Sequence, residues 1–158
     1  MRTLVVGLGN PILTDDGIGV AVARAAALEW EARCRPSAPA PDEVAFAEAS
    51  VGGLRLLDVI AGYERVILVD AIQTAAGRPG QIYRLGPGDL RASLHAGSTH
   101  DLTLPGALAL GRSLGMPLPD DADIVIIAIE VEDVLTFGER CTPAVEAAIP
   151  RAVEAVLE

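Results

Sequence analysis

Three side chains that could do chemistry stand at the ends of expected helices and strands. Asp16 opens a helix after a glycine-rich turn, Asp70 ends the most apolar strand, and His100 stands in a polar loop before another helix. Two carboxylates and one imidazole form a mixed oxygen and nitrogen ligand set, which suits Zn, Ni, Fe or Mn and leaves positions open for a substrate. Since the chain has no HExxH or Asp-x-His spacing, such a site must be assembled from distant segments.

Each of these residues also has an ordinary structural explanation. Acids in a first helical turn, such as Asp15 and Asp16, complement the helix dipole by about 0.3–1 kcal/mol each. Asp70 could equally be a satisfied turn residue, and the second histidine, His95, is interpreted as a surface histidine. If the first and third strands are neighbours, however, Asp16 and Asp70 face one cleft, where two close carboxylates need a cation or a shared proton.

The segments that must position these residues alternate between strand and helix patterns. Apolar runs predict four strands, and a weaker alternation predicts an edge strand or hairpin arm: residues 3–6, 44–47, 65–70 and 124–129, and residues 81–85. Helical patterns cover residues 16–33, 53–60, 104–114 and 143–157, with Thr142 as N-cap, Pro143 at the first helical position, and Pro150 expected to kink or split the last helix. The proline-rich residues 36–41 predict a connecting loop.

This alternation predicts an α/β fold in a single domain, residues 1–158. We expect a three-layer αβα sandwich around a mostly parallel sheet of about five strands. In such sheets ligands bind beyond the carboxyl ends of the strands. The predicted site residues follow or precede elements at that edge.

Composition excludes several function classes. All 12 basic residues are Arg, and the absence of Lys removes Schiff-base chemistry and a P-loop. The net charge of −10 argues against nucleic acid as a partner, because phosphate binding needs a basic surface. The 51% hydrophobic content excludes a disordered chain. What remains for chemistry is a short inventory of carboxylates, two histidines, two cysteines and a single asparagine, Asn10.

The sequence shows no sign of export or of a membrane anchor. Residues 3–7 are typical of a strand that runs into a turn rather than of a signal peptide. No apolar run approaches the ~20 residues that span a membrane. Two cysteines outside any CxxC pair do not form a disulfide framework. We therefore expect a cytoplasmic protein with no membrane partner, and a monomer.

The glycine-rich turn raises the possibility of a dinucleotide site. Gly7 and Gly9 follow a strand and precede a helix, but Ile12 stands where the third glycine would be. Asp15 and Asp16 would also repel the pyrophosphate that the helix N-terminus should attract. Dinucleotide binding is therefore disfavoured.

The same turn carries a family resemblance. Residues 7–20, with the sequence Gly-Leu-Gly-Asn-Pro-Ile-Leu-Thr-Asp-Asp-Gly-Ile-Gly-Val, resemble the opening of the hydrogenase maturation proteases. The resemblance continues through residues 69–72, 98–102 and 142–146 and so spans nearly the whole chain. It implies an endopeptidase that removes the C-terminal extension of the large-subunit precursor of a [NiFe]-hydrogenase.

Carried over residue by residue, the resemblance implies that Asp16, Asp70 and His100 interact with the metal and carry catalysis. The implied enzyme is a nickel-dependent endopeptidase of the aspartic or metallo type. Its nickel arrives bound to the precursor, and other divalent metals would fit the same ligands. Gly9 and Asn10 would let the loop backbone approach the substrate peptide. The chain departs from the family at residues 48–52, where Glu48 begins a stretch that is usually of the Asp-Gly-Gly-Thr kind.

Two alternatives remain open at this point. The same three residues would serve a non-catalytic metal-recognition or assembly factor that docks on a metalloenzyme precursor without cutting it. Residues 7–11 also resemble the start of the peptidyl-tRNA hydrolases, although that family's catalytic histidine has no counterpart near position 20 and the charge of −10 suits tRNA badly.

Overall fold

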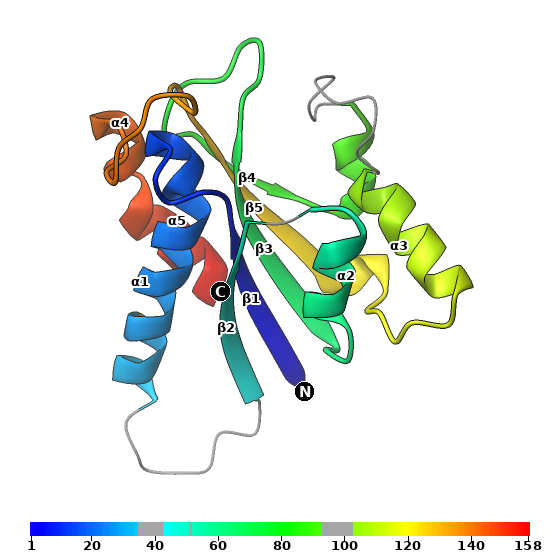
Figure 1. The fold of residues 1–158 in the computed structure, drawn as a ribbon. Helices are drawn as coiled ribbons and strands as arrows, with labels where there is room; N and C mark the ends of the chain where they lie inside the picture. Colours follow the sequence, from blue (N-terminus) through cyan, green and yellow to red (C-terminus); the bar gives the residue numbers. More distant parts are fainter. Residues whose placement is uncertain (35–42, 51, 93–102) are drawn as a thin grey trace.

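Five strands form one sheet in the order β2-β1-β3-β5-β4. The computed structural model describes residues 1–34, 43–50, 52–92 and 103–158 (Figure 1). The strands are β1 (Arg2–Leu8), β2 (Glu43–Ala49), β3 (Arg65–Ile72), β4 (Ile82–Leu85) and β5 (Ile124–Glu130). The first, second, third and fifth pair in parallel, and β4 lies antiparallel on the outer side of β5. The predicted edge strand is therefore confirmed, as is the neighbourhood of the first and third strands.

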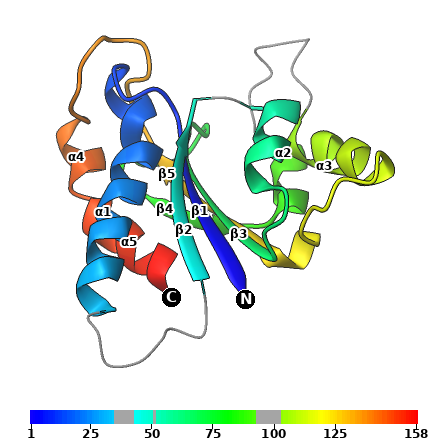
Figure 2. The same ribbon diagram turned by 60° about the horizontal axis from the view of Figure 1, so that its bottom comes forward.

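Helices cover both faces of this sheet. The α-helices are α1 (Ile18–Arg33), α2 (Leu54–Ile60), α3 (Leu104–Ser113), α4 (Pro143–Glu146) and α5 (Ile149–Leu157). Short 3-10 helices lie at Thr14–Gly17, Pro87–Ala92 and Asp121–Asp123. In Figures 1 and 2, α1, α4 and α5 lie on one side of the sheet, and α2 and α3 lie on the other. This is the predicted three-layer αβα sandwich.

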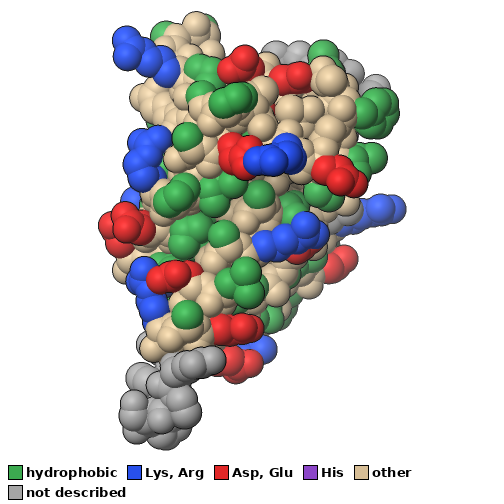
Figure 3. All heavy atoms as spheres, turned by 90° about the vertical axis from the view of Figure 1, so that its left-hand side faces the viewer, with side chains coloured by type: hydrophobic (Ala, Val, Ile, Leu, Met, Phe, Trp, Pro, Cys, Tyr) green, Lys and Arg blue, Asp and Glu red, His purple; other side chains and the backbone are tan. Residues whose placement is uncertain are grey.

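The central strands are apolar on both faces because both faces are covered. Along β3, Ile67 and Val69 belong to the core beneath α1 and α5, whereas Val66 and Leu68 belong to the core beneath α2 and α3. Such double burial is what a continuous apolar run in a parallel sheet indicates. On the outer side of the α1 layer, apolar side chains are interspersed with Arg, Asp and Glu (Figure 3).

Close packing of two glycines brings the start of α1 against the ends of the strands. A Cβ on Gly19 would collide with the carbonyl oxygens of Leu8 and Val69, and one on Gly7 would collide with the carbonyl oxygen of Gly19. The backbone of α1 can lie this near β1 and β3 only because neither position has a side chain. Asp16, three residues before Gly19, is thereby held at the carboxyl edge of the sheet.

One observed strand differs from its predicted bounds at a point that affects the site, and the last helix follows its prediction. β3 continues to Ile72, so Asp70 lies two residues before the end of the strand and not at it; Ala71 and Ile72 stay in the sheet because they pair with Ile129 and Glu130. The last helix is split as Pro150 predicted, with α4 ending at Glu146 and α5 beginning at Ile149.

The N-cap of α4 also differs in detail from the prediction. Thr142 occupies the N-cap position, and Pro143 follows it in the first turn, but the Thr142 side chain makes no capping hydrogen bond. Its hydroxyl instead donates to the carboxylate of Asp15. Within the described residues, no helix is both long and apolar enough to cross a membrane. The predicted loop over residues 36–41 lies outside the described residues.

Candidate active site

A cavity of about 460 Å³ opens at the carboxyl edge of the sheet. Its walls come from the ends of β1, β2 and β3 and from the loop after β5, and they include Gly9, Asp16, Ser50, Asp70, Gln73 and Val134. This is the place where parallel α/β sheets bind ligands. Two of the three predicted metal and catalytic residues, Asp16 and Asp70, are therefore brought to one cavity.

Asp16 reaches the cavity from the 3-10 helix that precedes α1. Its Oδ2 accepts a hydrogen bond from the backbone N–H of Asn10 at 2.8 Å. The turn at Gly9 has a φ of 127°, and a Cβ there would collide with the carbonyl oxygen of Asp16. A glycine is thus required for the loop to fold back onto Asp16.

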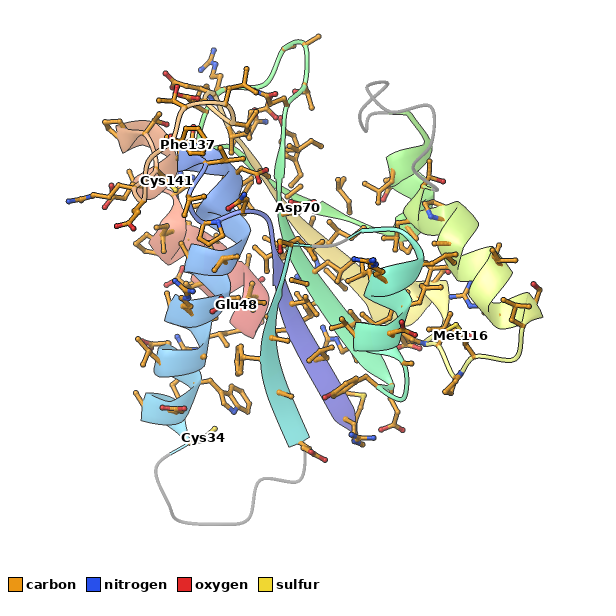
Figure 4. All side chains as sticks on the ribbon, viewed as in Figure 1. Cys34, Glu48, Asp70, Met116, Phe137 and Cys141 are labelled. Carbon is orange, nitrogen blue, oxygen red and sulfur yellow. The ribbon has the colours of Figure 1, made fainter. Side chains whose placement is uncertain are left out.

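Asp70 enters the same cavity from β3 (Figure 4). Burial raises the pKa of its carboxyl to about 7, against the opposing effect of the Ala71 backbone N–H, which donates to Oδ1 at 2.8 Å. The negative charge of Asp16 raises the pKa of Asp70 further. Near neutral pH the carboxyl of Asp70 is therefore about half protonated, and a cation could displace that proton.

The third predicted ligand, His100, and the other histidine, His95, lie outside the described residues. Within the described residues, no three His, Cys, Asp or Glu side chains lie close enough together to hold a metal ion. Asp16 and Asp70 supply two carboxylate ligands, and a full ligand set would need a further donor from His100 or from a bound substrate.

Asp15 faces away from this cavity and has a structural role. Its side chain is fully buried and accepts hydrogen bonds from the backbone N–H groups of Glu132, Asp133 and Thr142, at 3.1, 3.0 and 2.7 Å. The thiol of Cys141 lies next to it, with its Sγ 3.7 Å from the carbonyl oxygen of Thr14. Burial and the charge of Asp15 raise the pKa of that thiol to about 11, so it stays protonated at neutral pH.

The two residues predicted to contact substrate are placed differently. Gly9 lines the cavity. The side chain of Asn10 makes its hydrogen bond within its own loop, where Oδ1 accepts the backbone N–H of Ile12 at 3.2 Å. Asn10 therefore shapes the loop, and its backbone N–H orients Asp16.

Glu48, the acid in the segment that departs from the family pattern, is not part of the cavity wall. It forms a two-point ion pair with Arg24 of α1, at 2.6 and 2.8 Å. It therefore lies on the α1 side of the sheet, as does Gly7, its partner in register on β1. An acid at this position does not add a ligand to the site.

Sequence reasoning did not identify Ser50, Gln73 and Val134 as wall residues. Ser50 and Gln73 directly follow β2 and β3, so the rule that sites form at the carboxyl edge could have found them. The sequence around Val134 did not indicate a place in the cavity wall, because Val134 does not directly follow a strand. It belongs to the loop of residues 131–142, whose path is decided by its hydrogen bonds to Asp15.

The chain matches known proteins over nearly its whole length. Residues 31–158 match the family model described as hydrogenase maturation protease. The chain is 31% identical to the hydrogenase 2 maturation protease of Escherichia coli over 158 residues, which covers 99% of this chain and 89% of that protein. It is also 28% identical to the protein named coenzyme F420 hydrogenase subunit delta of Methanothermobacter thermautotrophicus, covering 98% of this chain and 92% of that one.

Comparison with solved structures gives the same family. The hydrogenase maturating endopeptidase HybD from E. coli superposes with a TM-score of 0.72 at 30% identity, covering 99% of this chain and 90% of the other. Of the two resemblances of the glycine-rich turn, these matches support the one to the proteases. Together with the carboxylate pair at the cavity, they show that the chain belongs to the hydrogenase maturation protease family.

Proposed function

We propose that this protein removes the C-terminal extension of a [NiFe]-hydrogenase large-subunit precursor after nickel has been inserted. The observation that carries the proposal is the pairing of Asp16 with a half-buried Asp70 in one open cavity, where the pKa of Asp70 is raised to about 7. The 31% identity to a protein named hydrogenase 2 maturation protease supports the choice of substrate.

The carboxylate pair suits a substrate that carries its own cation. Burial and the negative charge of Asp16 raise the pKa of Asp70, and a divalent ion would compensate both the lost solvation and the repulsion. In the proposal, nickel is bound by the precursor, and Asp16, Asp70 and His100 engage it when the precursor docks. Other divalent metals with the same preference for oxygen and nitrogen ligands would fit as well.

Cleavage then needs a polarised carbonyl and a proton acceptor. A bound nickel ion supplies Lewis-acid polarisation of the scissile carbonyl or lowers the pKa of a bound water. A carboxylate oxygen that does not bind the ion would accept the proton of the attacking water. Gly9 forms its part of the wall without a side chain, so the backbone of the substrate peptide can approach closely.

The direct test is incubation with nickel-loaded and nickel-free precursor, followed by intact mass spectrometry of the precursor. We expect shortening of the nickel-loaded form only. Asp16→Asn, Asp70→Asn and His100→Ala should each slow cleavage by about 100-fold or more, because each removes a ligand or a proton acceptor. Equal cleavage of the nickel-free precursor would refute metal dependence, and full activity of Asp16→Asn would refute the residue roles.

A second candidate is a non-catalytic assembly factor that recognises the metal in a precursor. It is favoured by the 28% identity to a protein named as a subunit of a hydrogenase. The same mass spectra separate the two functions, because an assembly factor binds the nickel-loaded precursor and leaves its mass unchanged.

A further inference from the structure

Two large apolar side chains stand almost fully exposed beside the candidate active site. Leu135 is 85% exposed and Phe137 is 80% exposed. Both belong to the loop of residues 131–142, and Figure 4 shows Phe137 near the start of α1, toward the same end of the molecule as Asp70. Large side chains of this kind, when they gather on a surface, indicate an interaction site.

A third apolar side chain joins them from the glycine-rich turn. The backbone of Ile12 accepts a hydrogen bond from the N–H of Gly138 at 2.9 Å, and Leu13 pairs with Gly138 in a parallel bridge. Ile12, which is 49% exposed, therefore lies next to the residue that follows Phe137. We call Ile12, Leu135 and Phe137 the apolar patch.

The loop that presents the patch is held in one shape. Asp15 binds both ends of the loop through the N–H groups of Glu132, Asp133 and Thr142. Near its middle, Oδ1 of Asp133 accepts the N–H groups of Leu135 and Thr136 at 3.1 and 2.9 Å. Preorganisation of this kind lowers the entropy lost on binding.

The loop that carries Leu135 and Phe137 also contributes to the cavity wall. Val134, the residue before Leu135, lines the cavity that also holds Asp16 and Asp70. Exposed polar residues flank the apolar ones along the loop: Glu132, Thr136, Glu139 and Arg140. An apolar centre with a polar rim is the usual composition of a protein interface, and an aromatic side chain such as Phe137 is among the residues enriched there.

From this arrangement we propose that the apolar patch docks an apolar surface of the hydrogenase large-subunit precursor next to the bond that is cleaved. The inference rests on the proposed function for the identity of the partner. The two sets of residues contact different parts of the precursor. The carboxylates of the cavity engage the cation and the scissile bond, and the patch supplies affinity for the surrounding protein. The proposal adds Ile12, Leu135 and Phe137 as determinants of substrate recognition.

The test compares two double variants with matched exposure. Leu135→Ser/Phe137→Ser removes the patch, and Leu28→Ser/Leu114→Ser removes two apolar side chains that are 70% and 71% exposed on α1 and at the end of α3. Binding of purified nickel-loaded precursor is measured in an Asp70→Asn background, so that no cleavage disturbs the equilibrium. We expect about tenfold or weaker binding for the patch variant and unchanged binding for the control.

In the chain with Asp70 intact, the patch variant should raise KM and leave kcat unchanged. Unchanged thermal unfolding would show that the exposed substitutions leave the fold intact, and Phe137→Ala alone should give an intermediate loss of affinity. If the precursor binds but is never shortened, the protease function fails while the binding comparison still decides the role of the patch. Equal affinity of the two double variants would overturn the proposal, and so would a KM that the patch substitutions leave unchanged in the chain with Asp70 intact. So would sedimentation showing that the patch instead holds two copies of this chain together.

Discussion

The carboxylate of Asp15 is bound by Thr142, which lies 127 residues further along the chain. Oδ1 accepts the backbone N–H of Thr142 at 2.7 Å and its hydroxyl at 3.0 Å, while Oδ2 accepts the N–H groups of Glu132 and Asp133. One buried side chain thus ties both ends of the 131–142 loop to the start of α1. The next residue, Asp16, faces the cavity instead. Asp15 therefore stabilises the fold, whereas the adjacent Asp16 belongs to the candidate site.

We expect Asp15 and Asp16 to respond oppositely to substitution. Asp15→Ala removes the acceptor of three partly buried N–H groups and should lower the free energy of unfolding by about 3 kcal/mol or more. Asp16→Asn retains an oxygen that accepts the N–H of Asn10. It should change the free energy of unfolding by less than about 1 kcal/mol while abolishing cleavage. Urea unfolding followed by circular dichroism measures both. Equal destabilisation by the two substitutions would contradict this separation.

The raised pKa of Asp70 should make stability depend on pH. Burial holds the pKa at about 7 in the folded chain, against an ordinary value of 3.8, so the folded state keeps its proton while the unfolded state loses it. The contribution of the Asp70 carboxyl to the free energy of unfolding is therefore greatest below pH 4. This contribution falls as the pH rises from about 4 to about 7 and is constant above that range. Because the side chain is only partly buried, we expect a loss of about 1–2 kcal/mol.

Asp70→Asn removes that titration and isolates the contribution of this carboxyl. Relative to the unsubstituted chain, the variant should gain free energy of unfolding at pH 8 compared with pH 4.5. Asp58→Asn, at an exposed acid of α2, is the control for removal of a negative charge. The measurement is denaturant unfolding of the metal-free protein at the two pH values. A difference between Asp70→Asn and the unsubstituted chain that is the same at both pH values would contradict the assignment.

Gly19→Ala should strongly destabilise the fold. Its Cβ would collide with two backbone carbonyl oxygens, of Leu8 and Val69, and the backbone of paired strands cannot move aside as a flexible side chain can. We expect a loss of about 2 kcal/mol or more in the free energy of unfolding. Gly88→Ala is a suitable control, since no atom lies within 4 Å of its Cβ. Similar melting temperatures for the two variants would argue against close packing of α1 on the sheet.

The ion pair between Glu48 and Arg24 should be dispensable for activity. Both side chains are largely exposed, at 43% and 61%, and exposed pairs contribute little to stability. Glu48→Gln should therefore cleave precursor at the unsubstituted rate, measured by mass spectrometry beside Asp16→Asn. A marked loss of cleavage would mean that Glu48 acts on the site after all.

Local sequence patterns were enough to predict much of the architecture. The run of apolar residues at 65–70 predicted a strand buried on both faces, and Pro150 predicted the break between α4 and α5. Both signals are local: periodicity reports which faces are covered, and proline removes a helical hydrogen bond wherever it stands. The glycine-rich turn and Asp16 were also recognisable, because their order along the chain matches the family.

The family resemblance selected Asp16 and Asp70, but local patterns alone could not separate Asp15 from Asp16 or Glu48 from Asp70, and only the tertiary structure showed what each carboxylate contacts. All four are acids near the ends of elements, and the sequence gives no measure of which way a carboxylate points. The distinction came from partners far along the chain, namely the 131–142 loop for Asp15, α1 for Glu48, and a shared cavity for Asp16 and Asp70. The exposure of Leu135 and Phe137 was hidden for the same reason. A local pattern records what a residue is, whereas burial and contact depend on what the rest of the chain brings to it.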